Sequence, residues 1–284
     1  MKFKLVILYT SAVLIGAICS QLTSKLVGAL PEVVSESSGL LFYNDELITH
    51  NDSGNTPTLY FLDKNTFKVK RKVVVANAKN IDWEDITQDQ HFIYVADFGN
   101  FNGDRKDLCI YKISKKDIHT KDKVTAEKIY YSYPDQDSFT RTTRSDFDAE
   151  ALFSKGDNLF VLTKQWQGKG TNAYKIPKKQ GVYKAVSVGS YKTNGMVTGA
   201  NYNSKTDKVV LVGYNMFMLP FAVEITGLSD ANLFSGSVKK TPLDIGFAQV
   251  EGVTNLDNNT YYISSESFLK LGASASVFKL TVNK

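Results

Sequence analysis

Short runs of apolar and aromatic residues alternate with polar turns along most of the chain, a pattern that predicts β-strands. In five places an apolar run follows a polar turn, and a second run follows after a longer loop. An aromatic residue stands second in four of the five later runs. The paired runs cover residues 47–49 and 59–62, 92–95 and 110–113, 159–162 and 173–176, 209–212 and 222–225, and 261–263 and 277–280.

A three-residue segment precedes each pair of runs. It holds a polar residue, then usually a small one, then an apolar one, and successive segments begin 46, 66, 48 and 53 residues apart. Similar chemistry at a similar offset indicates five diverged copies of one unit. The segments are Ser38-Gly39-Leu40, Glu84-Asp85-Ile86, Glu150-Ala151-Leu152, Thr198-Gly199-Ala200 and Glu251-Gly252-Val253.

The units predict an all-β fold, a β-propeller of five four-stranded blades. Four copies continue into a fourth strand, as at residues 72–75 and 128–132, whereas the chain ends just after the third strand of the fifth copy. Residues 25–28 through 32–34 precede the first copy and are the expected donor of the missing strand, which closes the ring. A β-sandwich or solenoid is the alternative, and the 66-residue second copy leaves six blades open.

Length and composition fit one domain. The 284 residues are 43% hydrophobic, and a propeller of this size has a single continuous core. We expect residues 21–284 to form it and residues 1–20 to be a leader, in which Lys2 and Lys4 precede a short apolar run. The protein then works outside the cytoplasm, secreted, periplasmic or at the cell envelope. Lipid attachment at Cys19 is the alternative to simple cleavage.

The net charge and the motifs that do not occur in the sequence argue against several classes of function. Without the two leader lysines, 32 basic residues face 29 acidic ones, and a net charge of +3 does not indicate nucleic-acid binding. Only three histidines are present, none in a paired spacing, so a histidine-built zinc site is not expected. No nucleophile elbow, phosphate-binding loop or dinucleotide fingerprint occurs.

Acidic residues recur at matching places in the copies. The first strand of each blade lines a propeller's channel, so Ser38, Glu84, Glu150, Thr198 and Glu251 are expected to form a ring. Carboxylates crowded there repel one another unless a cation compensates, and calcium accepts such oxygen ligands. The candidate metal ligands are Glu84, Glu150 and Glu251. The alternative is structural: the carboxylates accept backbone hydrogen bonds and fix the blades to one another.

A second group of polar residues stands where the second strands end, and it is expected to border the same mouth. The mixture of acids, a lysine and aromatic residues suits a ligand-binding surface, and equally an internal salt-bridge network. The candidates are Asp52, Asp97, Lys164, Tyr214 and Glu266, with Arg105 and Trp166 from adjoining loops. Trp83 is expected to pack between blades.

Six short motifs between about residues 35 and 280 resemble, in their order along the chain, those of a known protein family. They are Ser38-Gly39-Leu40, Asn51-Asp52-Ser53-Gly54, Asp82-Trp83-Glu84-Asp85, Asp97-Phe98-Gly99-Asn100 with Arg105, Asp148-Ala149-Glu150-Ala151-Leu152 and Val250-Glu251-Gly252. In them the chain resembles the SdiA-regulated and phytase-like group of exported bacterial β-propellers. The resemblance implies a propeller fold, an extracytoplasmic address and often calcium. The basic residues of true phytase sites are not recognisable here.

Two functions remain open at this point. The first is an exported binding or interaction module with calcium or another cation at an acidic channel mouth, whose partner is an unidentified small molecule or extracellular protein. The second is a metal-assisted hydrolase of a phosphoester or lactone, with the same three glutamates holding the metal. In both, contact with a membrane is expected only through a lipid anchor.

Overall fold

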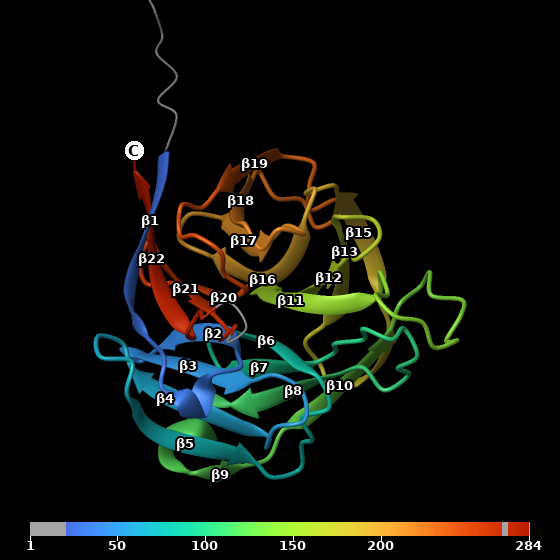
Figure 1. Ribbon diagram of the computed structural model, residues 1–284. Helices are drawn as coiled ribbons and strands as arrows, with labels where there is room; N and C mark the ends of the chain where they lie inside the picture. The colour runs from blue at the N-terminus through green and yellow to red at the C-terminus, as the bar shows by residue number, and fades with distance from the viewer. Residues whose placement is uncertain (1–20, 269–271, 284) are drawn as a thin grey trace, which may run out of the picture.

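Five sheets surround one axis in the computed structural model, which describes residues 21–268 and 272–283 (Figure 1). The five-bladed propeller expected from the repeat is confirmed. The expected leader, including Cys19, lies outside the described residues. No helix in the described ranges is long and apolar enough to cross a membrane.

Each blade begins with an inner strand at the axis and adds strands outward. Blade 1 holds β2 (Ser37–Tyr43), β3 (Glu46–Asn51), β4 (Thr58–Asp63) and β5 (Val69–Val75). Blade 2 holds β6 (Trp83–Gln88), β7 (Phe92–Asp97), β8 (Cys109–Ser114) and β10 (Glu127–Ser132). Blade 3 holds β11 (Asp148–Lys155), β12 (Asn158–Lys164), β13 (Thr171–Pro177) and β15 (Val186–Tyr191). Blade 4 holds β16 (Met196–Asn203), β17 (Lys208–Tyr214), β18 (Pro220–Thr226) and β19 (Ser237–Pro242).

Blade 5 is completed from the other end of the chain. It holds β20 (Val250–Asn255), β21 (Thr260–Ser265), β22 (Ser276–Asn283) and, outermost, β1 (Gln21–Ala29), which pairs antiparallel with β22. The predicted closure is therefore confirmed, with one correction. The second part of the expected donor strand is a 3-10 helix, η1 (Glu32–Val34), because the chain must turn there from the rim of blade 5 to the axis.

Blades 1 and 2 each gain a short fifth strand from the blade that follows. β9 (Lys123–Val124) pairs parallel with β5, and β14 (Gly181–Lys184) pairs parallel with β10. β9 and the helix α1 (Lys115–Thr120) account for part of the extra length of the second copy, and a loop at residues 133–147 accounts for more. The long second unit therefore contains no sixth blade.

Apolar clusters fill the spaces between blades. Trp83 is fully buried in a cluster that combines residues of blades 1 and 2, such as Phe61 and Ile93, which confirms its expected packing role. Its ring meets that of His50 at a centroid distance of 5.4 Å. Similar clusters lie between each later pair of blades.

A β-bulge interrupts every inner strand near its first residues. In β6, Trp83 pairs with Asp97 and Asp85 with Ala96, so Glu84 is an extra, unpaired residue. A bulge turns the side chain of its extra residue away from the regular alternation. The bulge residues of the other inner strands are Ser38 with Gly39, Glu150, Thr198 and Glu251, the same positions that the repeat predicted as a ring.

The residue after each ring position is Gly or Ala in four of the five blades, because neighbouring inner strands nearly touch. A Cβ atom on Gly39 would lie 2.6 Å from the backbone nitrogen of Ile86, and one on Gly199 would lie 2.2 Å from the backbone oxygen of Glu251. Real Cβ atoms essentially never come so close to backbone atoms. The glycines therefore set the radius of the inner wall.

In blade 2 the residue after the ring position is Asp85, and its side chain bonds strands of other blades. Its carboxylate accepts the backbone N–H of Leu152 on β11 at 2.7 Å and that of Ala200 on β16 at 3.2 Å. Blades 2 and 4 are not neighbours, so this second bond spans the axis. The structural role expected for inner-strand acids is thus met by Asp85, which ties the inner strands of blades 2, 3 and 4 together.

Replacing Asp85 by Ala should lower the free energy of unfolding by about 3 kcal/mol, since it removes the carboxylate that accepts the buried backbone N–H groups of Ile86, Leu152 and Ala200. Chemical denaturation of Asp85→Ala against Asp137→Ala, an exposed aspartate on the 133–147 loop, would measure the difference. Equal stability of the two variants would contradict the bracing role.

Candidate functional site

The mouth end of the propeller, where the inner strands begin, concentrates carboxylates from three blades. Two groups of three have oxygen atoms within 4.8 Å of one another, and Glu84 belongs to both. One group adds Asp52, which follows β3, and Asp82, which precedes β6. The other adds Asp148 and Glu150 from the start of β11. We call these five residues the acidic mouth.

The carboxylates of the acidic mouth lie close together, with Asp52 and Asp82 half-buried and the other three buried, and both conditions raise their pKa values. For Glu84 burial is the main cause, followed by the charges of Glu150 and Asp52, and its pKa lies well above the usual range. Burial with the charges of Asp52 and Asp148 raises the pKa of Asp82 to about 7. Like charges held this close favour proton or cation binding.

Lys164, the last residue of β12, brings a positive charge to this cluster. Its ammonium lies 3.0 Å from Glu150, and both side chains are only 8% exposed. Its Nζ also lies 4.8 Å from the ring centre of Trp166 and 5.5 Å from that of Tyr214. Burial lowers the pKa of Lys164, but Glu150 and the surrounding acids raise it further, so the amine stays protonated.

Neighbouring groups fix the direction of Asp148. One carboxylate oxygen accepts the backbone N–H of Asn100 at 2.6 Å, and the other accepts the indole N–H of Trp166 at 2.8 Å. Trp166 in turn packs edge-on against Phe101, with ring centres 5.4 Å apart. Trp166 therefore serves as a positioning residue for Asp148 as well as part of the rim.

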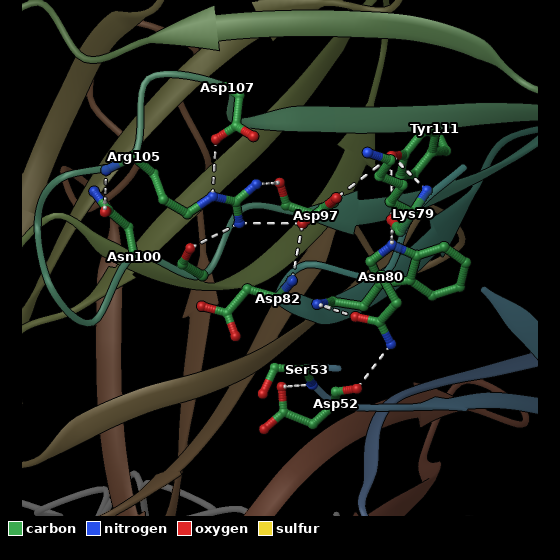
Figure 2. A network of polar contacts seen from close by, with 12 residues as sticks. Asp52, Ser53, Lys79, Asn80, Asp82, Asp97, Asn100, Arg105, Asp107 and Tyr111 are labelled. Atoms are coloured by element: carbon green, nitrogen blue, oxygen red, sulfur yellow. Dashed lines mark hydrogen bonds and ion pairs between the residues drawn. The ribbon is translucent and has the colours of Figure 1, made fainter. Parts of the chain in front are cut away.

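Asp97 and Arg105 stand behind the mouth and hold Asp82 (Figure 2). The guanidinium lies 3.1 Å from the carboxylate of Asp97 and also bonds the side chain of Asp107 at 3.1 Å. Asp97 accepts the backbone N–H of Asp82 at 3.0 Å, and Arg105 donates to the carbonyl of Gly99 at 2.9 Å. Arg105 is thus engaged with the protein and braces the loop behind the mouth.

Glu251 lies apart from both groups of three. It is 2% exposed, and its Oε2 has no hydrogen-bond partner among the described residues. Its pKa is raised well above the usual range by burial and by Glu266, while Lys164 opposes the shift. Burial and Asp52 raise the pKa of Glu266 to about 7. These two acids extend the negative charge along the blade 5 side of the mouth.

The five residues of the predicted ring therefore have different surroundings and roles. Glu84 and Glu150 come together as expected, whereas Glu251 joins neither group of three. Ser38 donates its hydroxyl to the backbone of Glu84 at 2.5 Å, and Thr198 donates to that of Val250 at 2.5 Å, so both tie adjacent blades. Of the second group, Asp52, Lys164, Tyr214 and Glu266 border the mouth with Trp166, and Asp97 and Arg105 lie behind it.

Asp82 and Asp148 were missed as candidate ligands. Each stands two residues before a ring glutamate, in the two Asp-x-Glu segments of the sequence. That spacing puts a second acid close to each of these ring glutamates in the chain, and the structure brings both aspartates within 4.8 Å of Glu84. The repeated pair of acids was therefore a readable signal.

The chemistry of the mouth is that of a hard-cation site. All five members offer carboxylate oxygens, the ligands that calcium and magnesium prefer, and neither histidine nor cysteine belongs to either group of three. A cavity of about 520 Å³ lies at the opposite end of the inner strands, and none of these acids lines it. The Asp85 brace lies between the two ends.

Comparison with known proteins adds little to this geometry. No protein-family model and no curated protein matches the chain. Among solved structures, it is similar to hydrazine synthase of Kuenenia stuttgartiensis, with a TM-score of 0.40 and 13% identity over 83% of this chain. The match spans 57% of that chain, and nothing about function carries over from it.

Stability without added cation should fall as pH rises from about 6 to 8. Asp82 and Glu266 have pKa values of about 7 in the folded protein, above their unfolded values, so the folded state holds more protons in this range. His50, whose pKa burial lowers to about 4, acts oppositely but mainly below pH 6.5.

We expect a fall in melting temperature on the order of 5 °C over that range in a chelator. Thermal melts of Glu266→Gln should show a shallower dependence, because the substitution removes one of the two titrating groups. A wild-type curve that is flat or rises with pH would show that these acids are ionised in the folded protein.

Proposed function

We propose that the acidic mouth binds a divalent cation, and that this cation is calcium. The observation that carries the proposal is the position of Glu84, which shares a 4.8 Å neighbourhood with Asp52 and Asp82 on one side and with Asp148 and Glu150 on the other. A cation beside Glu84 reaches oxygens from three blades. Its charge relieves the repulsion that raises the pKa values of these acids.

The donor set favours calcium over magnesium. Calcium takes six to eight oxygens in irregular arrangements, whereas magnesium requires near-ideal octahedral geometry. The carboxylates here come from separate blades and loops, and Asp148 already accepts two protein hydrogen bonds. The unpartnered, buried Oε2 of Glu251 offers another acceptor at the edge of the same charged region.

The bound ion serves an interaction module on this proposal. A propeller gives a rigid platform with loops at its mouth, and the cation joins loops of three blades into one surface. The resemblance to the SdiA-regulated and phytase-like group supports both calcium and an address outside the cytoplasm. The partner is then a small molecule or an extracellular protein that meets the mouth.

A metal-assisted hydrolase of a phosphoester or lactone is the second candidate. What favours it is the pair of carboxyls, Asp82 and Glu266, whose pKa values of about 7 suit a general base that activates water beside a metal. Turnover of a panel of esters, phosphoesters and lactones with calcium, lost in Glu266→Gln, would support it. No turnover by the wild-type protein would count against it.

Calcium should raise the melting temperature of the wild-type protein, and a chelator should lower it. With calcium at about a hundred times its dissociation constant, linkage gives about 2.7 kcal/mol of added stability. Isothermal titration calorimetry of Glu84→Gln should show at least a tenfold weaker affinity, since that residue joins both groups of three.

The matched control is Asp122→Asn, which removes an exposed acid just before β9 at the outer edge of blade 1. It should bind calcium like the wild type. If neither calcium nor magnesium gives measurable heat or a shift in melting temperature, the cation site is wrong and Lys164 alone balances the cluster.

A further inference from the structure

Exposed apolar side chains gather on two loops of blade 4 at the mouth end. The loop between β17 and β18 carries Met216, Phe217 and Leu219, which are 50%, 75% and 45% exposed. The loop between β19 and β20 carries Phe247, which is 63% exposed. Clustered apolar groups of this size mark an interaction surface more often than scattered single residues do. We call these four residues the apolar tips.

The protein holds the apolar tips in an ordered turn. The side-chain oxygen of Asn215 accepts the backbone N–H of Phe217 at 2.9 Å and that of Leu219 at 3.1 Å. Met218 adopts a left-handed backbone with φ of 60° and packs inward against the cluster between blades 4 and 5. The turn thus leaves Met218 half-buried and its apolar neighbours exposed.

The two loops are joined to each other and to the acidic region. The backbone N–H of Ala248 donates to the carbonyl of Met218 at 3.1 Å, and that of Glu266 donates to the carbonyl of Gln249 at 3.0 Å. The apolar tips therefore form the blade 4 side of the same face that holds the carboxylates. Anything that rests on them also faces the mouth.

Basic side chains border the apolar tips. Lys169 and Lys192 line a surface groove with Met216 and Phe217, and the ammonium of Lys169 lies 3.1 Å from the sulfur of Met216. Lysines with long apolar stems beside exposed aromatic residues suit the boundary between acyl chains and anionic headgroups. The carboxylates of the mouth oppose such a surface until a cation balances them.

We propose that this face docks on a lipid surface with anionic headgroups, and that docking requires a cation in the acidic mouth. The apolar tips enter the boundary region, the two lysines meet headgroup phosphates, and the bound ion removes the repulsion from the carboxylates. The cation clause rests on the proposed function. Two loop tips that project outward fit a deformable lipid surface better than a shaped protein pocket.

Vesicle sedimentation tests the proposal with the full chain. The wild-type protein should sediment with vesicles of phosphatidylcholine and phosphatidylglycerol in calcium, and at least tenfold less in a chelator. The double variant Phe217→Ser, Phe247→Ser should lose about a hundredfold in vesicle affinity, since each buried phenylalanine contributes a tenfold factor or more. Val182→Ser, which removes an apolar residue 81% exposed on β14, is the control and should bind like the wild type.

The outcomes separate docking from cation binding. Calcium titration without vesicles reports the mouth alone, and the double variant should titrate and melt like the wild type. Docking is overturned if the wild type stays in solution with calcium and vesicles, if the double variant sediments equally well, or if the chelator has no effect. It is also overturned if sedimentation velocity shows a wild-type dimer that the double variant abolishes, because the tips then join two copies.

Discussion

The approach of the five inner strands at the axis is the constraint on which the rest depends. The backbones come so close that glycine follows three of the five ring residues, and Asp85, which follows a fourth, bonds across the axis. Strands this close cannot all continue in regular pairing, and each carries a bulge near its first residues. The bulges turn their extra residues out of the regular alternation. The candidate site is thus a consequence of how the ring closes.

Two adjacent acids of blade 2, Glu84 and Asp85, have different roles because different groups surround them. Asp85 is fully buried, and burial raises its pKa, but backbone N–H groups from three strands bond its carboxyl group and oppose the rise, which makes it a brace. Glu84 is nearly as buried, yet other carboxylates surround it, and they raise its pKa further. The energetic cost of burying Glu84 is therefore left for a proton or a cation to offset. The positive charge of Lys164 offsets only part of this cost, because its ion pair is with Glu150.

Repetition in the sequence predicted the architecture well, because five similar strand patterns with one strand missing have few ways to close. The ring positions were also predictable, since the bulge residues recur at matching places. The repeated Asp-x-Glu spacing could have pointed to Asp82 and Asp148, but the repeat did not predict that Asp52 would join them and that Glu251 would lie apart. The bulges bring Glu84 and Glu150 beside Asp52, Asp82 and Asp148, while Glu251 faces Lys164 and Glu266. The ion pair between Arg105 and Asp97 was not predicted either, because the loop after β7 must fold back to bring Arg105 to the end of that strand.

The direction of β1 has a consequence for how the molecule sits in its surroundings. Ala29 pairs with Ser276, Ser276 with Ser265 and Ser265 with Val250 at the mouth end, so β1, which starts at Gln21 opposite Asn283, begins at the other end of the ring. A tether attached before Gln21 would hold the propeller at the end opposite the mouth, so that the mouth would face away from the point of attachment. A chain anchored in this way would meet a second surface rather than the one that carries it, and the ring would act as a spacer between the two.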